Sequence, residues 1–279
     1  MKQKFKLISG VTLLEMLLGI VISTIMMAAL FTAYNVVNNS YSQVSNKAGM
    51  SRTGRDIVGM LLRDVRMAGH FDIRSTRIVS GDSLNPIKIT KAKKFSGDSR
   101  ECDKIEIVYG DSIYTEGANP EFTYPIYKIT YECKKSKIPD RQKGKNAAGN
   151  YPTKDIFAIY KSKVSWDVKN KDWKKGKTDS DVNTYADELV IDHVEDLIFI
   201  PINDKGLSIK PIPTGSDVYK IRAIDIMIII RSPDPFYKNK FQRVLFSLSD
   251  NARNQSRKDK FLRESIVVTA HNRNIGTTK

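Results

Sequence analysis

Apolar residues follow three patterns along this chain. From Val11 to Ala33 nearly every position is apolar, a run of about 23 residues that is long enough to cross a bilayer as a helix. Over residues 37–66 apolar positions recur at helical spacing, with polar residues and arginines between them. No proline interrupts residues 1–85, so the pattern predicts one long helix over residues 11–70, with its transmembrane part at about 11–33.

Beyond residue 70 the period of the apolar positions shortens toward two, which is typical of strands. Clusters of Gly, Pro, Asn and Lys separate the apolar runs. We therefore predict an α+β fold, in which the long N-terminal helix packs on an antiparallel β-sheet domain over residues 71–279. The predicted strands cover residues 103–109, 126–133, 155–160, 188–200, 219–231, 241–248 and 265–270.

Glu15 is the only charged residue in the apolar run. A carboxylate at bilayer depth costs roughly 2.5–3.5 kcal/mol on insertion scales, so such a residue usually has a partner. Three lysines precede the run, and no compact basic cluster follows it before Lys47. The positive-inside rule then keeps the head in the cytoplasm and sends the domain across the membrane. A plain signal anchor, in which Glu15 is merely tolerated near the interface, is the alternative.

The junction Ser9-Gly10-Val11 and the glutamate at Glu15 together resemble the class III signal of type IV prepilins and of type II secretion pseudopilins. The resemblance implies that residues 1–10 are a leader and that a prepilin peptidase cuts between Gly10 and Val11. It also implies methylation of the new terminus, retention of the apolar helix and a role for Glu15 in filament assembly. Val11 departs from the Phe that this family most often has as its first mature residue.

Three further segments resemble minor pilins of the PilW type. Residues 63–70, RDVRMAGH, are similar to the stretch with which that family ends its long helix at a glycine. Residues 192–199, DHVEDLIF, are similar to an internal strand of the family, and residues 262–274 to its closing strand.

This second resemblance implies a minor pilin that takes part in initiating and assembling type IV pili. Its partners would be other minor pilins and pilus assembly proteins. It would be a single-pass protein of the inner membrane with its C-terminal domain in the periplasm, with the pilus as a further location. A J-type pseudopilin of type II secretion is the near alternative.

Charge adds a third alternative. Lys and Arg outnumber Asp and Glu by 46 to 31, which gives a net charge of +15. A Lys-rich surface accounts for this excess, whereas a DNA-capturing competence pilin would use it to hold nucleic acid. No nucleic-acid motif supports that second interpretation.

The two cysteines, Cys102 and Cys133, suggest one disulfide in a chain carried across a membrane, and two buried thiols are the alternative. Signatures of catalysis are missing from the sequence. His70, His193 and His271 lie far apart, and neither a nucleophile elbow nor a P-loop occurs. We therefore expect a structural role, with no catalytic residues, no cofactor and no metal.

Overall fold

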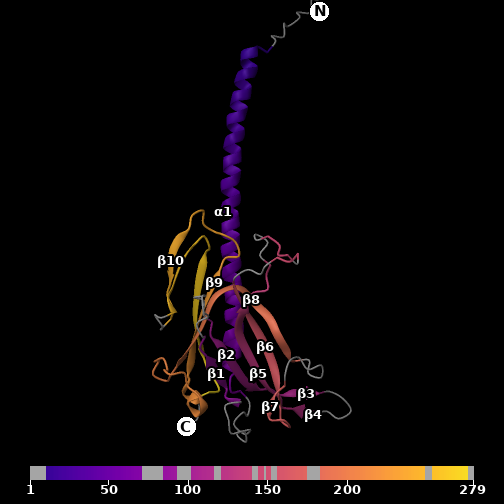
Figure 1. Cartoon of the computed structure of the whole chain (residues 1–279), viewed down its shortest axis with the longest axis vertical. Coiled ribbons are helices and arrows are strands. Elements are labelled where there is room, and N and C mark those ends of the chain that lie inside the picture. The colour runs from indigo at the N-terminus through magenta and orange to yellow at the C-terminus, as the bar shows by residue number, and fades with distance from the viewer. Residues whose placement is uncertain are drawn as a thin grey trace, which may run out of the picture. The chain divides into compact units, whose positions relative to one another are not determined.

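The structure, a computed structural model, describes residues 11–70, 84–92, 102–115, 121–139, 144–147, 149–151, 156–174, 183–248 and 253–275. The chain divides into two compact units, Met1–Ala48 and Gly49–Lys279. One helix, α1 (Leu13–Met67), contributes its first part to the first unit and its second part to the other (Figure 1). The sheet lies entirely in the second unit, so the α+β fold class predicted from the sequence is confirmed.

The first part of α1 is mostly apolar on every side up to Ala33, and Asn and Ser residues join the apolar ones beyond it. Its large side chains are exposed without exception from Val11 to Val44, and Leu13 reaches 83% exposure. An apolar surface of this extent marks a helix that lipid or other apolar helices cover. Among the described residues, α1 is the one helix long and apolar enough to cross a membrane.

From Gly49 onward α1 is amphipathic. One face carries arginines and is exposed, while the other packs into the core. The buried residues of this face are Met50, Gly54, Ile57, Val58, Leu61, Asp64 and Val65. The helix ends at Met67, and Gly69 follows in a left-handed conformation with φ of 72°, as its place in the sequence predicted. The Gly69 amide then donates to the Val108 carbonyl at 2.9 Å, which ties the end of the helix to the sheet.

The main sheet is antiparallel throughout and has the order β1-β2-β5-β6-β8-β9-β12, with β7 pairing to β6 (Figure 1). Its strands are β1 (Ile87–Thr90), β2 (Lys104–Gly110), β5 (Ile126–Lys135), β6 (Phe157–Asp167), β7 (Asp172–Trp173), β8 (Tyr185–Ile202), β9 (Ala223–Arg231) and β12 (Arg263–His271). Two hairpins lie outside it, β3 (Ile113–Thr115) with β4 (Glu121–Thr123), and β10 (Phe241–Leu245) with β11 (Gln255–Asp259). A short 3-10 helix, η2 (Gly215–Lys220), precedes β9.

One face of the sheet packs against the second part of α1, and every strand in the order above contributes to this core. The opposite face carries two smaller apolar clusters. Leu245 of β10 covers Ile198, Ile200, Met227 and Ile229. The rings of Trp166 and Trp173 meet edge to face at 5.0 Å beside Leu84 and Val108, so both tryptophans are packing residues of the β6–β7 hairpin.

Each of the seven predicted strands corresponds to an observed one. β6 and β8 are longer than expected, and the predicted start of β9 is instead the 3-10 helix η2. The prediction missed β1, β3, β4, β7 and β11. All five have five residues or fewer, so they offer too few alternating positions for the period-two signal.

Cys102 and Cys133 form a disulfide in the structure, with their Cα atoms 5.9 Å apart. Cys133 lies in β5, and Cys102 lies just before β2 in a parallel bridge with Leu197 of β8. The disulfide therefore links β5 to the place where the start of β2 meets β8.

A matched pair of glycines in α1 tests the packing of the helix. A side chain at Gly54 would collide with Ile266 of β12, whereas nothing lies within 4 Å of a Cβ placed at Gly59. We expect Gly54→Leu to destabilise the domain by about 1–3 kcal/mol through overpacking. Gly59→Leu should stabilise it by up to about 1 kcal/mol, because Leu favours a helix over Gly. Denaturant unfolding of the full chain in neutral detergent measures the free energy of unfolding of each variant. Equal changes for Gly54→Leu and Gly59→Leu would contradict this packing.

Candidate functional site

The start of α1 is a capping box built by Thr12 and Glu15. The Thr12 amide and its hydroxyl donate to Oε2 of Glu15, at 2.9 Å and 3.1 Å. In return, the Glu15 amide donates to the Thr12 hydroxyl at 3.3 Å. This reciprocal arrangement satisfies amides that a helix leaves open at its N-terminus. The Thr-x-x-Glu spacing is the sequence signature of such a cap, so the capping role of Glu15 is visible in the sequence beside its charge.

The capping box occupies one oxygen of Glu15 and leaves the other available. Oε1 has no hydrogen-bond partner within the described ranges of the chain. The side chain is exposed and stands among exposed apolar residues such as Leu13, Leu14 and Met16. In an apolar environment a carboxylate oxygen without a donor is costly, so this position favours a cationic partner from outside the described chain.

The predicted processing junction is described only in part. Gly10 lies outside the described residues. Val11 is the first described residue and is 71% exposed, one position before the capping threonine. A new N-terminus at Val11 would therefore stand next to the first turn of α1.

In the second unit, α1 is joined to the sheet by a buried carboxylate. Asp64 accepts a hydrogen bond from the Tyr131 hydroxyl at 2.6 Å and pairs with the Lys161 ammonium at 2.7 Å. The side chains of Asp64 and Lys161 are 3% and 7% exposed. Burial and the Asp64 carboxylate raise the pKa of Tyr131, so the phenol keeps its proton and remains a donor. The helix, β5 and β6 are thus joined by a buried carboxylate, a phenol and an ammonium that satisfy one another.

Two consecutive carboxylates of β8, Glu195 and Asp196, lie in the interior beside a bulge. His193 has a φ of 61°, and the register of β8 shifts between Val194 and Asp196. Every residue of β8 from 194 to 201 is buried, because both faces of the sheet are covered there, and Glu195 and Asp196 are 2% and 1% exposed. Each then requires compensation by a cation.

Arg253 compensates one of these carboxylates and bridges it to a second. Its two terminal nitrogens contact Asp103 at 2.7 Å and Asp196 at 2.6 Å. Asp103 also accepts from the Lys91 ammonium at 2.8 Å and from the Phe199 amide at 3.0 Å. Burial raises the pKa of Asp196 to about 7, with Arg253 opposing the rise and Asp103 adding to it.

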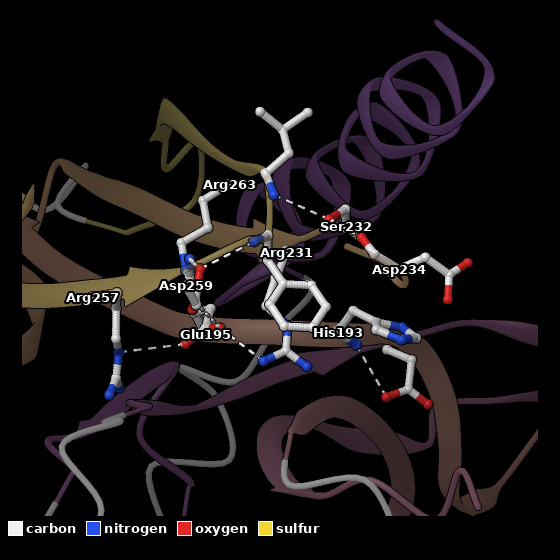
Figure 2. Close-up of polar contacts among 11 residues, drawn as sticks. His193, Glu195, Arg231, Ser232, Asp234, Arg257, Asp259 and Arg263 are labelled. Carbon is white, nitrogen blue, oxygen red and sulfur yellow. Dashed lines mark hydrogen bonds and ion pairs between the residues drawn. The ribbon is translucent and has the colours of Figure 1, made fainter. Parts of the chain in front are cut away.

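Glu195 lies among three arginines, as Figure 2 shows. Its carboxylate is 3.1 Å from Arg263, 3.5 Å from Arg231 and 4.0 Å from Arg257. Arg263 also forms a two-point contact with Asp259, at 2.7 Å and 2.6 Å. This cluster joins β8, β9, β11 and β12 through charges that the sheet and its hairpin bury.

The three segments that resemble minor pilins are joined to neighbouring parts of the domain by these contacts. Glu195 of the internal strand pairs with Arg263 of the closing strand. The amide of Asn274, at the end of the closing segment, donates to the carbonyl of Arg66 at 3.2 Å, and Ile275 packs beside Gly69. These side chains therefore join segments that lie far apart in the sequence.

No group of three or more His, Cys, Asp or Glu side chains placed to hold a metal ion occurs in the described part of the chain. The buried acids are instead engaged by arginine, lysine and tyrosine. The arrangement can fix strands in register and can present a helix.

No family model and no curated protein matches this chain. Among solved structures, the chain is similar to a type IV-like pilin from Thermus thermophilus, with 9% sequence identity and a TM-score of 0.47. That match covers 81% of this chain and 96% of the other.

Removal of Arg253 tests the Asp103–Asp196 bridge. Arg253→Met leaves two buried carboxylates facing each other, which should cost about 3–5 kcal/mol near pH 8. Losing the arginine raises the pKa of Asp196 still further above its unfolded value, so its native state gains a proton as the pH falls. The loss in the free energy of unfolding caused by Arg253→Met should therefore become smaller as the pH falls from about 8 to about 5.

The matched control is Arg222→Met, at an exposed arginine before β9. It should change the free energy of unfolding by less than about 0.5 kcal/mol at either pH. A loss for Arg253→Met that does not depend on pH would show that packing, and not charge, makes this residue important.

Proposed function

We propose that this chain is a membrane-anchored pilin-like subunit, specifically a minor pilin that helps to initiate and assemble a type IV pilus. The observation that carries the proposal is the start of α1. A single carboxylate, Glu15, stands at the head of an apolar helix that is exposed on every side. Such a helix needs lipid or other helices around it, and its carboxylate needs a cation.

The mechanism follows from the chemistry of a cleaved terminus. Cutting after Gly10 would create an ammonium at Val11, next to the N-terminal end of the helix. The helix dipole disfavours a positive charge there, so this ammonium is better placed against a carboxylate. Oε1 of Glu15 can accept it, from the same chain or from a neighbour, while Oε2 keeps the cap. Pairing between neighbours would set the register of adjacent helices in an apolar environment.

The sheet domain has a complementary role in this proposal. The buried contacts of Asp64 fix β5 and β6 to the second part of α1, and the other charge clusters fix strands of the domain to one another. The partners would be other minor pilins, pilus assembly proteins and the prepilin peptidase at the inner membrane. The J-type pseudopilin has the same helix chemistry and differs in the subunits with which it would co-purify.

Processing is the first test of the proposal. Protein extracted from membranes of cells that carry a prepilin peptidase should begin at Val11 and bear a methyl group on its terminal nitrogen. Intact-mass and peptide mass spectrometry measure this directly. Gly10→Val should block the cut and leave the full-length chain. An uncut wild-type chain in the presence of the peptidase would refute the proposal.

Glu15 is tested by variants that separate its charge from its capping bond. Glu15→Gln keeps an acceptor for the Thr12 amide but removes the charge. Thr12→Ala keeps the charge and removes part of the cap, at a cost of about 1 kcal/mol. We expect Glu15→Gln and Glu15→Ala to impair filament assembly and co-purification with other minor pilins alike. Thr12→Ala should remain close to wild type.

All three variants should still be cleaved and should accumulate in the membrane. The two Glu15 variants remove a charge, which eases insertion, and Thr12→Ala adds none. Immunoblots of membranes and sheared filaments measure both properties. If Glu15→Gln assembles normally while Thr12→Ala fails, the capping box is the whole role of Glu15. The subunits recovered with the wild-type chain then distinguish a pilus from a secretion system.

A further inference from the structure

A basic groove lies where α1 ends, and none of the roles above uses it. It is an open groove of about 600 Å³ within the second unit. Its described lining is Gly59, Leu62, Arg63, Arg66, Met67, His70, Arg273 and Asn274. Three arginines from two distant segments thus share one groove, and no Asp or Glu is present among the described lining residues.

These arginines are not used by the fold. Arg63 is 69% exposed and reaches only Asp64, at 3.5 Å, whose carboxylate already serves Tyr131 and Lys161. The exposed side chains of Arg66 and Arg273 make no ion pair with any residue in the described ranges. Guanidinium groups placed side by side without carboxylates repel one another, so an anionic partner would relieve a local excess of charge.

Capping of α1 does not account for them either. Basic side chains often satisfy the last carbonyls of a helix. Here the Asn274 amide donates to the carbonyl of Arg66 at 3.2 Å, and the His70 amide donates to the carbonyl of Met67 at 2.8 Å. The arginine side chains are therefore left for a contact outside the described chain.

The floor of the groove indicates the class of partner. Leu62 and Met67 are half-buried and apolar, and nothing lies within 4 Å of a Cβ placed at Gly59. A groove with an apolar floor and a guanidinium rim fits an apolar side chain flanked by carboxylates. No Phe, Tyr or Trp is among the described lining residues to offer a stacking surface for bases, which single-stranded nucleic acid would favour. The lining also has arginine and no lysine, although lysine is the commoner basic residue of this chain.

We propose that this groove, formed by the end of α1 and the segment after β12, binds a carboxylate-rich segment of a partner protein. Arg63, Arg66 and Arg273 hold the carboxylates, and Leu62 and Met67 receive an apolar side chain between them. The site is separate from the membrane helix and does not depend on cleavage at Gly10. It can therefore be tested independently of the filament role.

The test uses the full chain in neutral detergent and two fluorescent probes of equal charge, a poly-glutamate peptide and a single-stranded oligonucleotide. Fluorescence anisotropy measures the affinity of each. The test variant is Arg63→Gln/Arg66→Gln/Arg273→Gln. The matched control, Lys205→Gln/Lys240→Gln/Lys258→Gln, removes the same charge from exposed positions elsewhere. Thermal unfolding of each variant shows that it remains folded.

We expect the arginine variant to bind poly-glutamate about tenfold more weakly than wild type, with the lysine control close to wild type. Binding of wild type should weaken with added salt. Equal losses in the two variants would overturn the proposal, because they would show that net charge alone attracts the probe. Tighter binding of the oligonucleotide, lost in the arginine variant, would assign the groove to nucleic acid instead.

Discussion

The buried face of α1 supplies the surface against which β1, β2, β5, β6, β8, β9 and β12 pack. Each of these strands sends apolar side chains into the same core, and α1 is the element that covers them. Gly54 permits this contact at close range, because Ile266 of β12 occupies the space that a larger residue would need. A sheet of this size with one apolar face exposed to water would associate with other molecules through that face. The helix prevents this by covering the face.

The buried charges act on top of this apolar layer. Replacing such clusters with apolar residues of similar volume is often neutral or stabilising, so they are weak evidence for stability. Their geometry favours another role here. Asp64 is recognised by Tyr131 and Lys161 from two neighbouring strands, and Glu195 by arginines from β9, β11 and β12. We infer that they select one register among several that apolar residues alone would accept.

Much of this arrangement could be predicted from the sequence, for local reasons. The helix and the longer strands follow from periodicity, and the end of α1 follows from Gly69. The capping box at Thr12 and Glu15 was equally visible, because it depends on residues three positions apart. The burial of Glu195 and Asp196 could not be predicted, because only arginines distant in the sequence make two adjacent buried acids acceptable.

The same limit applies to contacts between the two ends of the domain. Arg66 and Asn274 meet across nearly the whole domain, and α1 packs against β12, the last strand. During synthesis the helix emerges first, and Asn274, which satisfies its last turn, follows Arg66 by 208 residues. The amphipathic part of α1 is therefore made long before the strand that packs against Gly54. Contacts so distant in sequence slow folding, because a long loop must close before they form.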